Sequence, residues 1–319
     1  MDMAELGTSG ASVSALCLGT DYYGSRTPAE TAHRLMDAFH EAGGTFLDTS
    51  NIYARWIPGF VGGESESTIG DWMARRRNRS AMFVATKMCG DYLDVPYGLR
   101  AVDIRRECDK SLARLRTDWI DLYYAHADDR QTPLPEIVEA FDSLISAGKV
   151  RMVGASNWAT WRLAEARQIA EANGWVSPSA LEYRCTYLRP RTGAVFAPQV
   201  AADDQLLDYA RDKQLPIVAY SILLNGAYSR SDRPVPGRYV GPDTDARLAA
   251  LQVVSAETGA TPAQVVIAWL RQRPQQIIPI VGGSTLEQIR ENVAAANLRL
   301  TSDQVNRLDS AGNETPSDD

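Results

Sequence analysis

Three residues with acid–base side chains each follow a short apolar run in the sequence. Asp48, Lys87 and His126 stand directly after runs that begin at Thr45, Phe83 and Trp119. A carboxylate, an ammonium group and an imidazole together could move a proton to or from a reacting oxygen. A lysine that ends a buried run also needs a counter-charge, because an unpaired buried cation is costly. Taken alone, Asp48 could simply cap the end of a strand.

These side chains converge only if the apolar runs are parallel strands. Short β-type runs alternate with longer helical patterns along the chain of 319 residues. Such alternation predicts parallel strands with right-handed crossovers, and eight βα units favour an α/β fold of the closed (β/α)8 TIM-barrel type over an open sheet. In that barrel the active face lies at the C-terminal strand ends. Those ends also carry Ser156-Asn157, Glu182, Tyr220-Ser221 and Gly282-Gly283-Ser284.

The apolar runs and the helical periods divide the chain as follows. Strands are expected at 15–18, 45–47, 83–86, 119–125, 150–154, 179–181, 217–219 and 277–281, and helices at 28–42, 65–77, 102–115, 134–147, 159–173, 205–213 and 286–296. A small β-hairpin is expected from Leu6 to Ser14, with Gly10 in its turn. The stretches 189–203 and 222–244 fit no βα unit and are expected to be long functional loops.

Composition narrows the class of protein. No Pro/Ser-rich linker divides the chain, so a single domain over 1–319 is expected, with 309–319 as a frayed tail. The net charge of −7 and the lack of a basic tract argue against a nucleic-acid partner. No apolar run reaches the length of about 18 residues that a membrane span requires, and no secretory signal is visible, so a cytoplasmic protein is expected. No metal site is expected, and the oligomeric state is left open.

Several distinctive phrases follow one another along the chain: Cys17-Leu-Gly-Thr, Leu47-Asp-Thr-Ser-Asn-Ile-Tyr53, Gly63-Glu-Ser-Glu66, Ala85-Thr-Lys87, Asp121-Leu-Tyr-Tyr-Ala-His126, Gly154-Ala-Ser-Asn157, Ala219-Tyr-Ser221 and the run from Pro279 to Asn292. Taken in order, they resemble the aldo-keto reductase family, and the resemblance runs from Leu6 to Leu308. The middle of the chain is similar to bacterial branches that act on keto-sugars. The family resemblance implies NAD(P)H-dependent reduction of an aldehyde or ketone, with a catalytic tetrad of Asp48, Tyr53, Lys87 and His126.

The chemistry of this tetrad can be argued from its side chains. Hydride transfer to a carbonyl carbon leaves alkoxide character on the oxygen, which requires a proton donor. Tyr53 suits this role if Lys87 lowers its pKa from the ordinary value of about 10. Asp48 would keep Lys87 charged and in place. His126 could donate a hydrogen bond that orients the carbonyl. Taken alone, Tyr53 could equally be a surface aromatic residue.

No G-x-G-x-x-G motif follows any expected strand, so the dinucleotide would bind at the barrel rim instead. Gly282-Gly283-Ser284-Thr285 precedes a helix and offers amides and hydroxyls for phosphate, although a simple capping box would look the same. The resemblance implies NADPH/NADP⁺, with NADH also possible. The implied cofactor-binding residues are Gly19, Thr20, Asp48, Ser156, Asn157, Glu182, Tyr220, Ser221, Ile222, Leu223, Leu224, Gly282, Gly283, Ser284, Thr285, Gln288, Glu291 and Asn292.

The sequence departs from the family pattern at two of these positions. Glu182 stands where many members have Gln, and an ionised carboxylate cannot donate to the nicotinamide carboxamide oxygen. Gln288 stands where members with a strong preference for NADPH often have Arg, so a bidentate partner of the 2′-phosphate is missing. Both departures concern the cofactor and leave the tetrad intact.

The expected partner is a small carbonyl compound. Aromatic residues in the βα loops could line its pocket or merely pack the loops, and those singled out are Tyr22, Trp56, Tyr92 and Trp158. Carboxylates and aromatics between Gly90 and Leu99 suit a polyhydroxylated ligand, so a sugar-like ketone is one hypothesis. Two other functions remain open. One is an NAD-dependent sugar or alcohol dehydrogenase, and the other is an NADP(H)-binding regulatory protein of the potassium-channel β-subunit type.

Overall fold

Eight parallel strands close into a barrel in the order β10-β3-β4-β5-β6-β7-β8-β9, as the alternating pattern predicted. The computed structural model describes residues 1–88, 90, 93 and 95–313. The strands are β3 (Cys17–Gly19), β4 (Phe46–Asp48), β5 (Phe83–Met88), β6 (Ile120–Ala125), β7 (Val150–Ser156), β8 (Ala180–Arg184), β9 (Ile217–Tyr220) and β10 (Ile277–Val281). Parallel register pairs Gly19 with Asp48 and Ser156 with Glu182, so the C-terminal strand ends meet at one rim.

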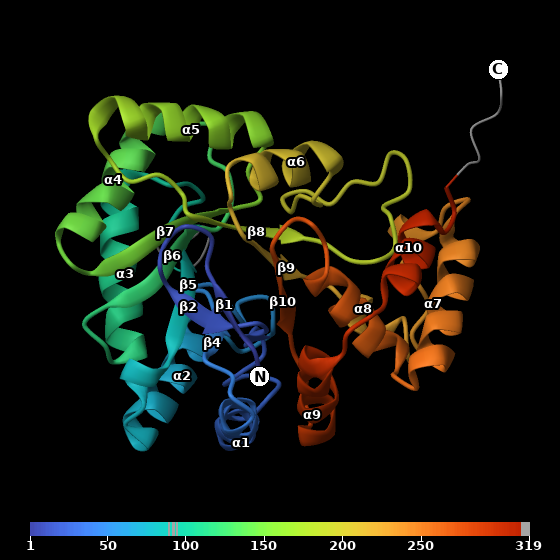
Figure 1. Ribbon diagram of the computed structural model, residues 1–319. Coiled ribbons are helices and arrows are strands. Elements are labelled where there is room, and N and C mark those ends of the chain that lie inside the picture. The colour runs from blue at the N-terminus through green and yellow to red at the C-terminus, as the bar shows by residue number, and fades with distance from the viewer. Residues whose placement is uncertain (89, 91–92, 94, 314–319) are drawn as a thin grey trace.

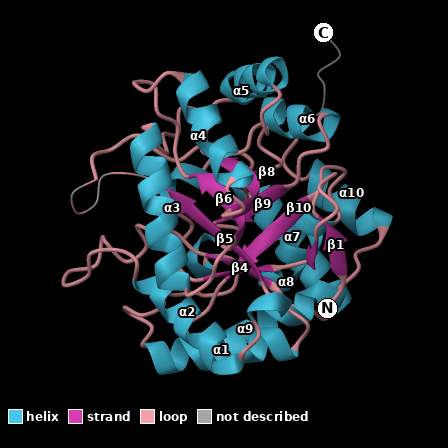
Figure 2. Cartoon of the chain, turned by 90° about the vertical axis from the view of Figure 1, so that its left-hand side faces the viewer, coloured by secondary structure: helices cyan, strands magenta, loops and turns pink. Residues whose placement is uncertain are grey.

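Helices surround this barrel, with α2 to α5 on one side in Figure 1 and α7, α8 and α10 on the other. They are α1 (Ala29–Glu41), α2 (Glu64–Arg76), α3 (Ala101–Leu115), α4 (Leu134–Ser146), α5 (Thr160–Asn173), α6 (Asp204–Asp212), α7 (Thr244–Thr258), α8 (Pro262–Arg271), α9 (Leu286–Ala294) and α10 (Ser302–Ser310). Short 3-10 turns lie at Arg79–Ala81, Leu224–Gly226, Gly237–Tyr239 and Ala295–Asn297. Figure 2 shows the strands enclosed by the helices in a second view.

Three helices were not expected from the sequence: α7, α8 and α10. Helix α8 has strong local signals, because Thr261 and Gln264 form a capping box and Pro262 occupies the first turn. Helix α10 begins with the same kind of box at Thr301. It ends within the segment that was expected to fray, where Asp309 accepts a hydrogen bond from Trp269 and the Ala311 carbonyl accepts one from Arg247. Residues 314–319 of the expected tail lie outside the described part.

The expected hairpin closes the N-terminal end of the barrel. Strand β1 (Met3–Glu5) pairs antiparallel with β2 (Ser12–Ser14), so the first strand begins earlier than Leu6. Leu6 and Val13 belong to the cluster of apolar side chains inside the barrel. Gly7 has a positive φ of 57°, and a Cβ there would lie 2.8 Å from the Gln214 carbonyl oxygen, so the turn requires glycine.

Two apolar layers lie on the two sides of the strands. The larger core fills the space between the barrel and the helices and includes Leu47 and Leu181. The smaller one fills the barrel interior, with Met152 of β7 packed against it and buried members on the other seven strands: Cys17, Phe46, Ala85, Leu122, Tyr124, Ala180, Val218 and Ile278. Because side chains alternate along a strand, residues two positions further along also face inward. Within the described part of the chain, no helix is long and apolar enough to span a membrane.

Candidate active site

A layer of charged side chains lies at the C-terminal end of the barrel, next to the cluster of apolar side chains in its interior. Asp48, Lys87 and Glu182 each stand two residues after an interior residue, namely Phe46, Ala85 and Ala180, and therefore point inward at the rim. The side chain of Lys87 is fully buried, and those of Asp48 and Glu182 are 2% and 4% exposed. Buried charges of this kind are tolerated only when they are paired.

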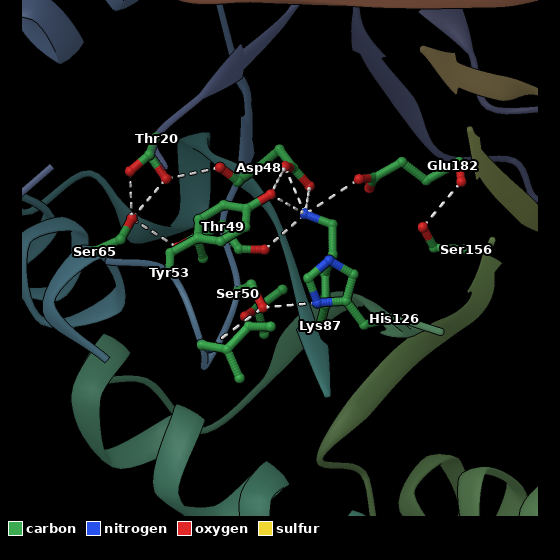
Figure 3. A network of polar contacts seen from close by, with 12 residues as sticks. Thr20, Asp48, Thr49, Ser50, Tyr53, Ser65, Lys87, His126, Ser156 and Glu182 are labelled. Carbon is green, nitrogen blue, oxygen red and sulfur yellow. Dashed lines mark hydrogen bonds and ion pairs between the residues drawn. The ribbon is translucent and has the colours of Figure 1, made fainter. Parts of the chain in front are cut away.

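Lys87 is the centre of the hydrogen-bond network (Figure 3). Its Nζ donates to both carboxylate oxygens of Asp48 at 2.6 Å and to the Thr49 carbonyl oxygen at 2.8 Å. It also lies 2.9 Å from the Tyr53 hydroxyl and 3.4 Å from Glu182 Oε1. Burial alone would lower the pKa of Lys87, but Asp48 and Glu182 raise it above the ordinary value, so the ammonium group stays charged.

Tyr53 is positioned by the loop that follows β4. The amides of Thr49 and Asn51 donate to the β5 carbonyls of Ala85 and Lys87, which ties the loop to the strand that carries the lysine. The Tyr53 hydroxyl then lies 3.1 Å from Asp48 Oδ2 and donates to it. The structure therefore brings together the phenol, the ammonium group and the carboxylate that were expected to act together.

The pKa of Tyr53 differs from the expectation. Burial raises it well above the ordinary value, and the nearby charges of Asp48, Glu182 and Asp21 raise it further. The net pKa is therefore raised and not lowered, because burial and the surrounding carboxyl groups outweigh the one ammonium group. A neutral phenol is nevertheless the form that can give up a proton to a developing alkoxide.

His126 faces Tyr53 across the opening, with ring centroids 6.1 Å apart. Burial, together with the positive charges of Lys87 and Arg55, lowers its pKa well below the ordinary value, so the imidazole is neutral. Its Nδ1 lies 3.1 Å from Ser50 Oγ. With Ser50 as the donor to Nδ1, the ring proton resides on Nε2, from which it can reach a substrate oxygen.

The next part of the rim carries the groups that the resemblance assigns to the nicotinamide. Ser156 Oγ donates to the Glu182 carbonyl, and Asn157 Oδ1 accepts from the Tyr220 hydroxyl at 2.7 Å and from the Val200 amide. The latter bond attaches the long stretch 189–203 to the rim. Left-handed backbone conformations, which are strained for residues other than glycine, also gather here: Asn157, Ser221, Leu224 and Asn225.

The other expected cofactor residues occupy two further positions. Gly19 ends β3, and Thr20 follows it and donates from Oγ1 to the Asp48 carbonyl at 2.7 Å. Ile222 and Leu224 are buried with the main core, and Leu223 packs against it, so these residues can offer mainly their backbone. All of them lie in segments that leave the C-terminal strand ends.

Side chains already hold the segment between β10 and α9. Thr285 caps α9, and Gln288 completes the capping box. Gln288 Oε1 also accepts from the Ser284 amide at 2.7 Å and from its hydroxyl at 3.3 Å. Glu291 accepts from the Thr261 hydroxyl, and Asn292 donates to the Gly282 carbonyl. The donors that could hold a phosphate are thus partly used by Gln288.

Of the four aromatic residues expected around the substrate, Trp56 lies beside Tyr53, and Tyr22 lies beside Trp56. The Trp56 ring lies edge-on to the Tyr53 ring at 5.9 Å and to the Tyr22 ring at 6.5 Å, and Trp56 is 48% exposed. Trp158, in contrast, is 2% exposed and belongs to the main core. Tyr92 lies outside the described residues.

Three residues at the site were missed from the sequence. Thr49 and Ser50 directly follow Asp48, and this polar run after a buried strand was the available signal. Asp21 follows Thr20 at the end of β3, and burial raises its pKa from 3.8 to about 6. A third carboxyl group therefore lies close enough to Asp48 and Lys87 to interact with both.

Comparison with known proteins agrees with this geometry. A model of the aldo/keto reductase family matches residues 15–313. An uncharacterised oxidoreductase of Bacillus subtilis, YrpG, is 34% identical over 99% of this chain and 98% of its own length. A norsolorinic acid reductase of Emericella nidulans is 30% identical over 94% of this chain and 78% of its own. An aryl-alcohol dehydrogenase of Pestalotiopsis microspora is 28% identical over 93% and 78%.

These relatives are oxidoreductases by name, the family match covers nearly the whole chain, and the barrel is the one that such enzymes use. The protein is a member of the aldo/keto reductase family and an oxidoreductase that acts on carbonyl groups.

Proposed function

We propose that the protein reduces an aldehyde or ketone with NADPH and that Tyr53 supplies the proton. The observation that carries this proposal is the position of Lys87 Nζ, 2.9 Å from the Tyr53 hydroxyl and 2.6 Å from Asp48. The buried ammonium group can stabilise the phenolate that remains after the proton has left. Asp48 keeps that ammonium group charged and fixed.

The substrate carbonyl would bind between Tyr53 and His126. The neutral imidazole donates from Nε2 to the carbonyl oxygen, and the phenol hydroxyl turns from Asp48 to the same oxygen. The nicotinamide, when bound, supplies the hydride to the carbonyl carbon. Negative charge that develops on the oxygen is then met by two donors already in place, so little reorganisation is needed.

The rim residues fit a nicotinamide dinucleotide. Ser156, Asn157 and Tyr220 present hydroxyl and amide groups beside the tetrad. Buried Glu182 Oε2 has no hydrogen-bond partner among the described residues, and an amide of the cofactor could provide one. The start of α9 offers amides for phosphate. We favour NADPH, with NADH as the alternative because an arginine is absent at Gln288.

For the substrate we propose a carbonyl compound with an aromatic ring. The support is the exposed Trp56 ring beside Tyr53 and Tyr22, together with the names of two relatives, a norsolorinic acid reductase and an aryl-alcohol dehydrogenase. A sugar-like ketone is the second candidate, because the Asp21 carboxyl group near Asp48 and Lys87 could accept hydrogen bonds from hydroxyl groups. Kinetics with matched panels of aryl aldehydes, aryl ketones and ketoses would distinguish the two.

Replacement of the phenol tests the reaction itself. We expect Tyr53→Phe to bind NADPH, measured by quenching of tryptophan fluorescence, but to reduce para-nitrobenzaldehyde about 10²–10⁴-fold more slowly. Wild-type turnover no faster than that of Tyr53→Phe would instead favour the regulatory, cofactor-binding role. Oxidation of alcohols with NAD⁺ that is faster than any reduction would favour the dehydrogenase.

A further inference from the structure

Glu182 is the charged residue of the site that the tetrad does not require. Its side chain is 4% exposed, and Oε1 lies 3.4 Å from Lys87 Nζ. Oε2 is buried and has no hydrogen-bond partner among the described residues. In Figure 3 the carboxyl group points toward Lys87 and Asp48, while Ser156 contacts only the Glu182 backbone. Oε2 is therefore the oxygen of this carboxyl group without a partner in the described part of the chain, and Asp48 lies close enough to interact with the carboxyl group as well.

The charges around Glu182 do not balance if every carboxyl group is ionised. Lys87 is one cation, and Asp48 already takes two of its hydrogen bonds. The other titratable groups that interact with Glu182 are neutral and also have raised pKa values: Cys17 on β3, Tyr53 after β4, Tyr124 on β6 and Tyr220 on β9. Asp21 interacts with Asp48 and Lys87, and His126 is uncharged. Burial and Asp48 accordingly raise the pKa of Glu182 well above its ordinary value.

The location of Glu182 relates this charge to the cofactor. Lys87 Nζ contacts both the Tyr53 hydroxyl and Glu182 Oε1, so one ammonium group links the two. A carbonyl oxygen that takes a proton from Tyr53 must touch that hydroxyl, and a hydride donor must lie against the adjacent carbon. A nicotinamide ring bound there would consequently lie within range of the Glu182 charge. That ring is positive when oxidised and neutral when reduced.

On the basis of the function proposed above, we propose that Glu182 is a proton-linked selector between the two redox forms of the cofactor. Opposite the neutral reduced ring it is a carboxylic acid, whose O–H can donate and whose C=O can accept, as a glutamine amide would. Opposite the positive oxidised ring it is a carboxylate that balances the ring charge. Binding of the oxidised cofactor therefore releases the Glu182 proton to solvent, and binding of the reduced cofactor does not.

This exchange makes cofactor preference depend on pH. Only the fraction of protein with ionised Glu182 can bind the oxidised cofactor. At pH values below the pKa of Glu182 in the folded protein, the apparent Kd of the oxidised cofactor therefore falls by up to about tenfold for each unit by which the pH rises. The Kd of the reduced form lacks this dependence. Both forms carry the same phosphates, so the ratio of the two Kd values isolates the effect of the ring.

The test is to measure both Kd values by tryptophan fluorescence from about pH 6 to about pH 9, within the interval between ordinary carboxyl and tyrosine pKa values. Calorimetry in two buffers of different ionisation enthalpy counts the protons released. For the wild type we expect the ratio Kd(NADPH)/Kd(NADP⁺) to rise with pH, and we expect more proton release with NADP⁺ than with NADPH. In Glu182→Gln both effects should vanish, and in Asp21→Asn, the matched control, both should persist.

Each contrary result overturns the proposal. A flat ratio in the wild type, equal proton release with the two forms, or an undiminished rise in Glu182→Gln would each exclude Glu182 as the linked group. Loss of the rise in Asp21→Asn alone would assign it to Asp21. If neither NADP(H) nor NAD(H) binds at any pH, the proposed function fails together with this inference. If both redox forms bind with a flat ratio, only this inference fails.

Discussion

The two sides of the barrel rim differ in how far their side chains are already arranged to act on a ligand. The prepared side is the one at β4, β5 and β6, whose polar groups already contact one another. On the side of β4, β5 and β6, the groups that would move the proton already touch each other, and Lys87 is fully buried. On the side of β10 and α9, the amide and hydroxyl donors at Ser284 and Thr285 are exposed and bonded to Gln288. The chemistry is thus preorganised, whereas binding of a phosphate would require Gln288 to move or to share its donors.

The largest effect should come from removal of the ammonium group on the prepared side. We expect Lys87→Met to reduce the rate of hydride transfer at least about a thousandfold, because neither Tyr53 nor the developing alkoxide retains a nearby positive charge. The variant leaves Asp48 buried without its partner, so unfolding should require about 3–5 kcal/mol less free energy. Single-turnover kinetics and thermal unfolding measure the two effects.

Lys149→Met is the matched control, because this lysine is 38% exposed and pairs with Asp109 on the surface. It should change neither quantity by more than a small amount. Hydride transfer that persists in Lys87→Met would show that the lysine does not assist the phenol, and the contrast between the two sides of the rim would lose its basis.

A smaller effect is expected at Ser50, which lies behind His126. In Ser50→Ala the imidazole Nδ1 loses the partner that places the ring proton on Nε2. Loss of one neutral hydrogen bond, about 1 kcal/mol, should lower kcat/KM about five- to tenfold, while the cofactor Kd stays unchanged. Ser143→Ala on α4, far from the rim, serves as the control. An unchanged kcat/KM would mean that the tautomer is set elsewhere.

Much of the prepared side could be predicted from the sequence. Asp48, Lys87 and His126 follow buried strands, and the alternation of side chains along parallel strands is enough to bring such residues together. The raised pKa of Tyr53 could not be predicted in this way, because it depends on burial and on three carboxyl groups that are far apart in sequence. The burial of Trp158 could not be predicted either, because a loop residue carries no periodicity that shows whether it faces the core or the opening.

The opposite side shows the complementary limit. The capping box at Thr285 and Gln288 is a local pattern and was visible as an alternative to a phosphate site. The additional bonds from Gln288 to Ser284 depend on the path of the loop before α9, which no local pattern fixes. Helices α7 and α8 lie between the expected strands 217–219 and 277–281. Neither was predicted from the sequence, although the capping box at Thr261 is a local pattern that indicates the start of α8.

Asp21 offers a test of electrostatics at the edge of the prepared side. Burial raises its pKa from 3.8 to about 6. The folded chain therefore binds this proton more tightly than the unfolded chain, and stability should fall as pH rises from about 4 to about 6 and then level off. Because the side chain is partly exposed, Asp21→Asn should recover only about 1–2 kcal/mol at neutral pH. Urea unfolding at several pH values measures this.

The control for Asp21 is Asp208→Asn, since Asp208 is 71% exposed on α6. That variant should follow the wild-type stability at every pH within a few tenths of a kcal/mol. If Asp21→Asn is instead less stable than the wild type at neutral pH, the Asp21 carboxylate is stabilised by its surroundings, and the site is less negative than its geometry implies.

A further effect is expected on the nucleotide side. Gln288→Arg replaces an acceptor with a guanidinium group at the start of α9, where it can pair with a 2′-phosphate. We expect the Kd for NADPH to fall about tenfold relative to that for NADH, with less gain at high salt because an exposed ion pair is screened. Gln288→Ala is the matched control, because it removes the hydrogen bonds that the Gln288 side chain makes at the start of α9 without adding charge. It should cost about 1 kcal/mol of stability and change both Kd values by a similar factor. If Gln288→Arg improves NADH binding as much as NADPH binding, the 2′-phosphate does not lie at this helix, and the released Ser284 and Thr285 donors serve a group that both cofactors share.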